Sequence, residues 1–87
     1  MTQEELKEEL ISNGYEDTVV FENPNYSSAF VGVSEEGRAI YSYEDMVIYL
    51  METDNMTEEE AAEFIDYNTV RSLPYVENSP IIMYKLV

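Results

Sequence analysis

The sequence contains no cysteine and no histidine among its 87 residues. Without cysteine the chain has no disulfide bond and no thiolate that could act as a nucleophile or metal ligand. Without histidine it lacks the commonest general base in enzymes and the commonest ligand of transition metals. Zinc, haem and thiol chemistry are therefore excluded, as are catalytic triads that need a histidine. We predict a protein that uses no metal and no cofactor.

Lysine and arginine are also scarce: 4 basic residues face 19 acidic ones, which gives a formal net charge of −15 at pH 7. Because contacts to phosphate need lysine or arginine, direct binding to nucleic acid or to an anionic membrane surface is disfavoured. No apolar run approaches the length of a membrane span, and the first residues lack the basic and apolar regions of a signal peptide. We therefore expect a cytoplasmic protein with no membrane contact.

Helix formation explains only part of the negative charge. A carboxylate stabilises the first turn of a helix, where it meets the positive end of the helix dipole. Acids expected at such positions are Glu4, Glu5, Glu44, Asp45, Glu58, Glu59 and Glu60. The acids that remain need another explanation, which is either solubility or a basic partner.

The best-defined segment of the sequence begins at Thr57. Thr57 and Glu60 have the spacing of a capping box, in which two side chains satisfy free amide groups at the start of a helix. This helix is expected to end at Leu73-Pro74, because proline disfavours helical geometry in the residue before it. Its buried stripe, at spacings of three, four and seven residues, is predicted to be Ala61, Phe64, Ile65 and Asn68.

Shorter elements precede this helix. Thr2 and Glu5 repeat the capping box and predict a helix over about residues 3–12. Runs rich in β-branched and aromatic residues then predict three strands, the last two joined as a hairpin: Val19–Phe21, Ser28–Ser34 and Arg38–Ser42. Ser42 with Asp45 predicts the start of a second helix. The buried residues of that helix are expected to be Met46, Val47, Leu50 and Met51.

The C-terminal run Ile81–Val87 is apolar nearly throughout, which is typical of a strand inside a sheet rather than at its edge. Residues 1–87 are thus predicted to form a single α+β domain with the element order α-β-β-β-α-α-β. Its two layers are a four-stranded, largely antiparallel sheet and the helices packed on it.

Three segments resemble a known group of proteins: Gly14–Pro24, Gly32–Ala39 and, above all, Glu63–Tyr75. In these segments the chain is similar to small acidic proteins of gut Firmicutes and of their phages and other mobile elements. The resemblance covers nearly the whole chain. It implies a bacterial or phage-derived cytoplasmic protein, and it assigns no functional residue.

Enzymatic and metal-binding functions are weakly supported by the sequence. The acidic loop Glu52–Asn55, with Glu58 nearby, offers oxygen ligands of the kind that calcium prefers. It lacks the alternating ligand positions and central glycine of an EF-hand loop, so a solvated connection between helices is the favoured interpretation. Carboxylate pairs are abundant, but none comes with a recognisable nucleophile or cleft. A carboxylate-only, metal-dependent enzyme is therefore the least favoured function.

The densest polar cluster is Asp66–Arg71. Asn68 falls on the predicted apolar stripe, so we expect its side chain to be buried and bonded to backbone. Arg71 is placed to stack on Tyr67, one turn earlier, or to pair with a carboxylate of another element. A structural role in fixing the chain before Pro74 is favoured over a role in recognition, because buried polar groups usually satisfy backbone groups.

The eight tyrosines divide by their local sequence. Those in periodic segments are expected to bury their rings in or beside the core: Tyr41, Tyr49 and Tyr84. Those that adjoin turn signals are expected at the surface: Tyr15, Tyr26 and Tyr75. An exposed tyrosine among carboxylates is typical of a binding hot spot, although isolated surface tyrosines are common.

We predict a small acidic protein-binding module whose partner is a basic protein surface. Glutamates four residues apart weaken a helix, and this spacing occurs at Glu4/Glu8, Glu5/Glu9 and Glu59/Glu63, so folding does not explain them. In a sharper form, the protein imitates nucleic acid and occupies the basic surface of a nucleic-acid-binding protein. The alternative is a structural or regulatory protein whose acidity only confers solubility. The predicted binding residues are Glu8, Glu9, Glu59, Glu63, Asp66, Tyr67, Arg71 and Tyr75.

Overall fold

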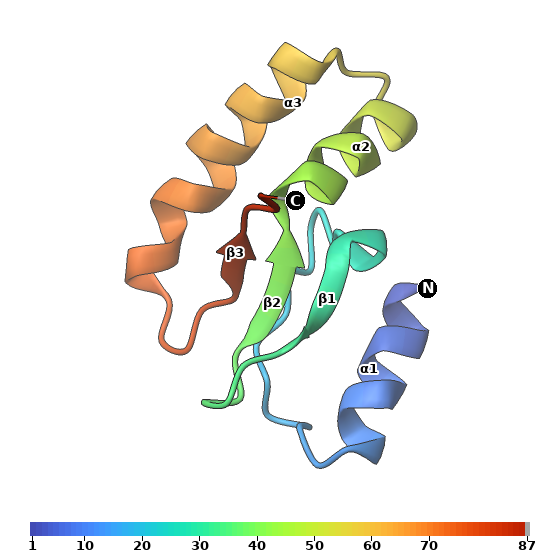
Figure 1. Ribbon diagram of the computed structural model, residues 1–87, viewed down its shortest axis with the longest axis vertical. Helices are drawn as coiled ribbons and strands as arrows, with labels where there is room; N and C mark the ends of the chain where they lie inside the picture. The colour runs from blue at the N-terminus through green and yellow to red at the C-terminus, as the bar shows by residue number, and fades with distance from the viewer. Residues whose placement is uncertain (87) are drawn as a thin grey trace.

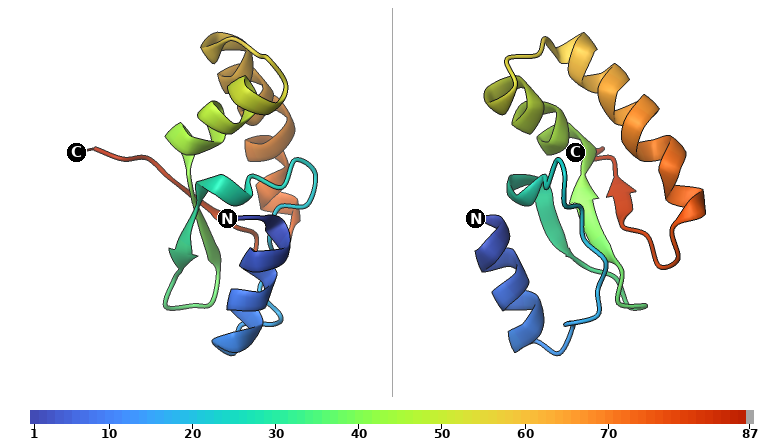
Figure 2. Two further views of the ribbon diagram at one scale, coloured as in Figure 1. Left: turned by 90° about the vertical axis from the view of Figure 1, so that its right-hand side faces the viewer. Right: turned by 180° about the vertical axis from the view of Figure 1, so that it is seen from behind.

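The computed structural model describes residues 1–86 and has an α+β fold, as predicted. Helices α1 and α3 lie on one side of a three-stranded sheet, and no helix of the described residues covers the other side (Figures 1 and 2). The helices and strands are α1 (Gln3–Ser12), β1 (Phe30–Val33), β2 (Ala39–Ser42), α2 (Tyr43–Thr53), α3 (Glu58–Phe64) and β3 (Ile81–Met83). A short 3-10 turn, Ser27–Ala29, precedes β1.

The strands lie in the order β1-β2-β3, so the prediction of a four-stranded sheet was wrong. β1 and β2 form the predicted antiparallel hairpin, whereas β3 runs parallel to β2. β3 is an edge strand of three residues, not the longer internal strand that its composition indicated. Its residues are only half-buried and those from Tyr84 to Leu86 are exposed, so their apolar character does not reflect burial. Val87 lies outside the described residues.

The predicted strand Val19–Phe21 is absent from the sheet. The chain here is attached by side chains instead of by a ladder of backbone bonds. The hydroxyl group of Thr18 donates a hydrogen bond to the carbonyl of Gly37 over 3.0 Å. The backbone amide of Phe21 donates to the hydroxyl oxygen of Tyr41 over 3.3 Å. These partners lie about twenty residues further along the chain, so β-propensity alone could not reveal them.

Aromatic rings join this segment to the core. The ring of Phe21 lies 5.5 Å from that of Tyr26 and 4.7 Å from that of Tyr41. Tyr26 has a left-handed backbone, with φ of 50°, and its side chain is fully buried, so its predicted place at the surface was wrong. The buried cluster at the centre of the molecule contains Tyr26, Ala29, Ala39, Tyr41, Met46, Val47, Leu50, Ala61 and Ile65.

The remaining tyrosines follow their predictions in part. Tyr49 is half-buried and packs against the core, as expected. Tyr84 is 55% exposed, contrary to prediction, because it lies beyond the end of β3. Its ring contacts that of Tyr43, with the ring centroids 4.9 Å apart. Tyr15 is exposed, as predicted.

Both predicted capping boxes are present. The hydroxyl oxygens of Thr2 and Thr57 accept hydrogen bonds from the amides of Glu5 and Glu60, each over 3.1 Å. Each glutamate carboxylate accepts a bond from the amide of its threonine over 2.9 Å. The bonds from the backbone and side chain of Thr2 hold the pKa of the Glu5 carboxyl below its usual value. Local sequence therefore fixes where α1 and α3 begin.

Helix α2 begins at the predicted residue, because the hydroxyl oxygen of Ser42 accepts a hydrogen bond from the amide of Asp45 over 3.4 Å. Its buried residues are Met46, Val47 and Leu50. Met51, predicted to be the fourth of them, is 38% exposed. Successive side chains of an α-helix point about 100° apart, so the side chain of Met51 points away from the core that Leu50 faces.

Helix α3 continues without a break into a π turn at Ile65–Thr69 and a 3-10 segment at Val70–Tyr75. The helical run ends at Tyr75, within two residues of the predicted stop at Leu73-Pro74, but its α-helical part ends earlier, at Phe64. A 3-10 segment of this length is unusual, and it extends the helical run along the whole side of the sheet (Figure 1).

The π turn changes which residue faces the core. A π turn contains one more residue than an α-helical turn, so the inward position passes from Asn68 to Thr69. Thr69 is buried, with its hydroxyl oxygen 3.5 Å from that of Tyr26. Asn68 is exposed, and the prediction that it is buried was wrong. Its side-chain amide still bonds to backbone, donating to the carbonyl of Phe64 over 3.2 Å.

Candidate functional site

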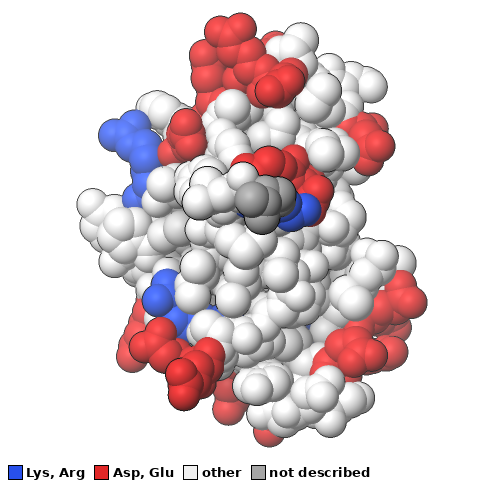
Figure 3. Space-filling model, viewed as in Figure 1, with Lys and Arg blue, Asp and Glu red and all other residues white. Residues whose placement is uncertain are grey.

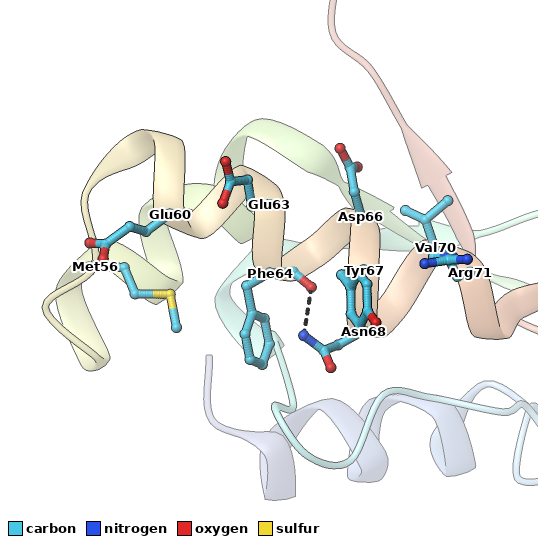
Figure 4. Close-up of a pocket in the computed structure, with 9 residues that line it drawn as sticks. All are labelled: Met56, Glu60, Glu63, Phe64, Asp66, Tyr67, Asn68, Val70 and Arg71. Atoms are coloured by element: carbon cyan, nitrogen blue, oxygen red, sulfur yellow. Dashed lines mark hydrogen bonds between the residues drawn. The ribbon is translucent and has the colours of Figure 1, made fainter.

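The outer surface of α3 and the π turn carries a shallow hollow with a volume of about 770 Å³. We call it the α3 hollow (Figure 4). One residue before the helix and one continuous stretch of helix form its lining: Met56, Glu60, Glu63, Phe64, Asp66, Tyr67, Asn68, Val70 and Arg71. Four of the predicted binding residues, Glu63, Asp66, Tyr67 and Arg71, are thus brought together at one site.

The apolar part of the hollow comes from four side chains. Met56, Phe64 and Val70 pack with their inner sides against the core, so they are held in place. Tyr67 lies outside them and is 70% exposed. A large aromatic ring on a fixed apolar base supplies contact area that loses little side-chain entropy when a partner binds.

The charged part of the hollow is mainly acidic. Figure 4 shows Glu63 and Asp66 pointing to one side of the helix and Phe64 to the other. The carboxylate of Glu60 is engaged in the capping box. Glu63 and Asp66 form no ion pair with any of residues 1–86, so their charges are free to meet a cation from outside.

Arg71 is the single base of the hollow, and it stacks on Tyr67 as predicted. Its guanidinium carbon lies 5.0 Å from the centroid of the Tyr67 ring. The alternative, a salt bridge from Arg71 to a carboxylate, does not occur within residues 1–86. A cation over an aromatic face is attracted by the ring quadrupole, and the same face is suited to a cation from a partner.

The other predicted binding residues lie outside the hollow. Glu59 is exposed on α3 but does not line it. Tyr75, at the end of the 3-10 segment, is 89% exposed, as expected. Glu8 and Glu9 are exposed on α1, which is a separate element of the fold (Figure 1). The structure therefore divides the predicted residues between two helices.

Sequence reasoning missed the apolar lining of the hollow. Phe64 was predicted only as part of the buried stripe, and Met56 and Val70 were not among the predicted site residues. Each of these side chains both packs on the core and reaches the hollow. The useful signal was the apolar pair Phe64 and Tyr67, three residues apart on the helical run, which makes the apolar stripe wider than the core requires.

The remaining basic residues are engaged elsewhere. Lys7 pairs with Glu22 over 2.9 Å and Lys85 with Asp45 over 3.0 Å. The side chain of Arg38 donates to the carbonyl of Ser79 over 2.8 Å, which fastens the hairpin to the approach to β3. Most of the acidic side chains thus have no positive neighbour in the described part of the chain.

A metal centre finds no support in residues 1–86, where no group of three or more acidic side chains is arranged to hold a metal ion. This holds for the loop Glu52–Asn55, which was the alternative metal site. Nor does any helix in this part of the chain have the length and apolar character needed to cross a membrane.

Comparisons of the chain with protein-family models, with curated proteins and with solved structures gave no match. The resemblance to small acidic proteins of gut Firmicutes and their mobile elements therefore stays a prediction.

Proposed function

We propose that the protein is a binding module for a basic protein surface, with the α3 hollow as a principal contact. The observation that carries this proposal is the exposed ring of Tyr67 beside two unpaired carboxylates, Glu63 and Asp66, on a base of core-anchored side chains. Exposed aromatic residues at the centre of a contact provide most of the energy in many interfaces. The carboxylates around it select a partner that carries lysine or arginine.

The sharper form of the proposal is that the protein occupies a nucleic-acid-binding surface. Such surfaces are rich in lysine and arginine because they contact phosphate. A chain with a net charge of −15 and a fixed aromatic anchor offers the two features that nucleic acid offers there, negative charge and a flat ring for stacking. A charge of this size also accelerates association with a basic partner.

Competitive elution tests this function. A lysate of a gut Firmicute, chosen because of the sequence resemblance, is loaded on immobilised duplex DNA and washed with the protein. We expect specific proteins to be released, and then to bind the purified chain directly. The Tyr67→Ala variant keeps the full negative charge and should bind the same proteins at least about tenfold more weakly.

Two controls separate a site from mere acidity. Tyr15→Ala removes another exposed tyrosine, outside the hollow, and should release the same proteins as the native chain. Polyglutamate at the same charge concentration should release them poorly, because it has no aromatic anchor. If polyglutamate and Tyr67→Ala release the same proteins as well as the native chain does, the acidity acts without a site and the proposal fails.

A further inference from the structure

The side of the sheet opposite α1 and α3 carries apolar side chains that no helix of the described residues covers: Val31 is exposed, and Ile40, Ile81 and Met83 are half-buried. In β2 and β3, Tyr41 and Ile82 pack against the core. Since successive side chains of a strand point to opposite faces, Ile40 and Ile81 point away from it. These two residues are paired with each other across the parallel strands. Ile40 and Ile81 therefore form an adjacent pair of isoleucines on the open face of the sheet.

β1 extends this apolar surface. The register between β1 and β2 shifts between Phe30 and Gly32, which indicates a β-bulge at Val31. Val31 is 50% exposed. Gly32 lies opposite Ile40, and a Cβ atom built on it would have no neighbour within 4 Å. The space above the centre of the sheet is therefore empty.

We call this surface the open sheet face and define it by four residues, Val31, Ile40, Ile81 and Met83. Met83 is paired with Ser42, two residues from the isoleucine pair, and so lies on the same face. Figure 3 views the molecule from this side: uncharged atoms occupy most of the middle of the surface, and acidic side chains, with a few basic ones among them, lie mainly around its margin.

The sequence accounts for acids at both ends of the open sheet face. Glu35 and Glu36 are exposed in the loop between β1 and β2, and they form no ion pair within residues 1–86. Glu44 and Asp45 lie in the first turn of α2, directly after β2. Lys85 neutralises part of this second pair. Arg38, which follows the hairpin loop and bonds to the uncharged Ser79, offsets one of the two loop acids. Each end of the face therefore carries one net negative charge.

We propose that the open sheet face docks a protein partner whose contacting surface is apolar at its centre and bordered by lysine or arginine. The partner's apolar residues would cover the two isoleucines and Val31, and its cations would meet the acidic margin. Charge complementarity selects this occupant. A second copy would bring an acidic margin against an acidic margin, at a net charge of −15 on each chain.

This proposal rests on the proposed function in one respect, which is that the partner is basic. The surface it names lies on the opposite side of the sheet from α1. The two surfaces are tested separately by amide NMR spectra of the isotope-labelled full chain. The probe is a helical peptide of leucine and lysine, about 18 residues long, with one apolar and one cationic side. We expect the largest shifts at the amides of Val31, Ile40 and Ile81.

Matched variants report on the same surface. The double variant Val31→Thr/Ile81→Thr keeps the β-branched shape and the charge but places hydroxyl groups on the open sheet face. It should bind the peptide about tenfold more weakly or worse. The control, Ile11→Thr, changes an isoleucine that is 61% exposed on α1 and should leave the affinity within about twofold. The dispersed spectra of the variants themselves show that each is folded.

Three outcomes would overturn the proposal. If the shifts are confined to the amides of Asp66, Tyr67 and Arg71, the α3 hollow is the binding site and the open sheet face is not. If the sheet amides are unmoved at about 1 mM peptide, no cationic apolar surface docks there. If these amides instead shift with protein concentration at about 0.5 M salt, and light scattering gives twice the monomer mass, the occupant is a second copy. The first outcome leaves the proposed function intact.

Discussion

The hydroxyl oxygen of Tyr41 accepts a hydrogen bond from the backbone amide of Phe21 over 3.3 Å, while the two rings lie with their centroids 4.7 Å apart. A single side chain of β2 thus both bonds and packs the segment that links α1 to the hairpin. Tyr41 is completely buried, so no water is available to replace this bond.

Removing this hydroxyl group tests its contribution. Tyr41→Phe keeps the ring but leaves the amide of Phe21 without its partner, and should lower the free energy of unfolding by about 1–2 kcal/mol. Urea titration followed by circular dichroism measures the change. Tyr75→Phe alters a ring that is 89% exposed and should have no effect. Equal stability of Tyr41→Phe and the native chain would show that the bond contributes nothing.

Stability should decline at alkaline pH. Burial raises the pKa of the Tyr41 hydroxyl to about 12, against an ordinary value of 10.0. Between these values the folded state holds a proton that the unfolded state has lost, so the stabilisation present below pH 10 is lost as the pH rises towards 12. The free energy of unfolding should therefore fall less between about pH 9 and pH 11 in Tyr41→Phe than in the native chain.

This alkaline loss should not vanish in the variant. Burial also raises the pKa of Tyr26. It raises the pKa of Tyr43 too, although this side chain is only half-buried, and the negative charge of Asp66 adds to that effect. Absorbance titration of the phenol groups should therefore show a group of tyrosines that ionise late, reduced by one in Tyr41→Phe. An unchanged titration curve would contradict the assignment of Tyr41 to this group.

The melting temperature should rise with sodium chloride. The chain carries a net charge of −15, and the ion pairs of the described residues are Lys7 with Glu22 and Lys85 with Asp45. Repulsion between carboxylates destabilises the compact state, and salt screens it within a Debye length of about 10 Å at 0.1 M. Differential scanning calorimetry from low to moderate salt measures the effect. A flat or falling melting temperature would mean that the acids are already balanced locally.

Two glycines of the hairpin should respond in opposite directions to alanine. Gly37 has φ of +83°, which side chains disfavour, so Gly37→Ala should destabilise the fold by about 1 kcal/mol. Gly32 has open space where the Cβ atom would lie, so Gly32→Ala should stabilise it by roughly 0.5 kcal/mol through the lower entropy of the unfolded chain. Urea unfolding of the two variants side by side decides this. Destabilisation by Gly32→Ala would show that the bulge needs glycine.

Charge on α1 should influence the speed of partner binding. Glu8 and Glu9 are exposed on a helix that contributes nothing to the α3 hollow, so their reversal to lysine should slow association and leave dissociation unchanged. Tyr75→Ala should instead accelerate dissociation, if this ring anchors the same partner. Surface plasmon resonance with a partner recovered by competitive elution separates the two rates. Unchanged association after reversal, at low and at high salt, would assign the acidity of α1 to solubility.

The elements that the sequence predicted well are those set by short-range chemistry. Both capping boxes, the start of α2 and the hairpin around Gly37 depend on residues three or four apart, and all are present. The failures involve distant partners. Val19–Phe21 has β-propensity but no strand to pair with, and the place of β3 at an edge depends on β2, which lies far back in the chain.

The candidate site was predicted in the same uneven way. Its polar residues were recognised because Asp66, Tyr67 and Arg71 lie close together, within six residues of the sequence. The apolar base of the site was not recognised, because Phe64 contacts both the core and the α3 hollow. A helical stripe in the sequence does not show which of its apolar residues also reach the surface. The inward position of Thr69 depends on a π turn, which no local pattern in the sequence marked.

The pairing of Ile40 with Ile81 also sets the order of events during synthesis. Arg38 and Ser79, which bond to each other beside this pair, are 41 residues apart. At about 5–20 residues per second, a ribosome needs roughly 2–8 s to make the chain between them. For that interval the nascent hairpin exposes the edge of β2 that β3 will later cover. An exposed strand edge is a template for other chains, so until β3 pairs with β2 the newborn protein presents an edge for aggregation that the folded protein has closed.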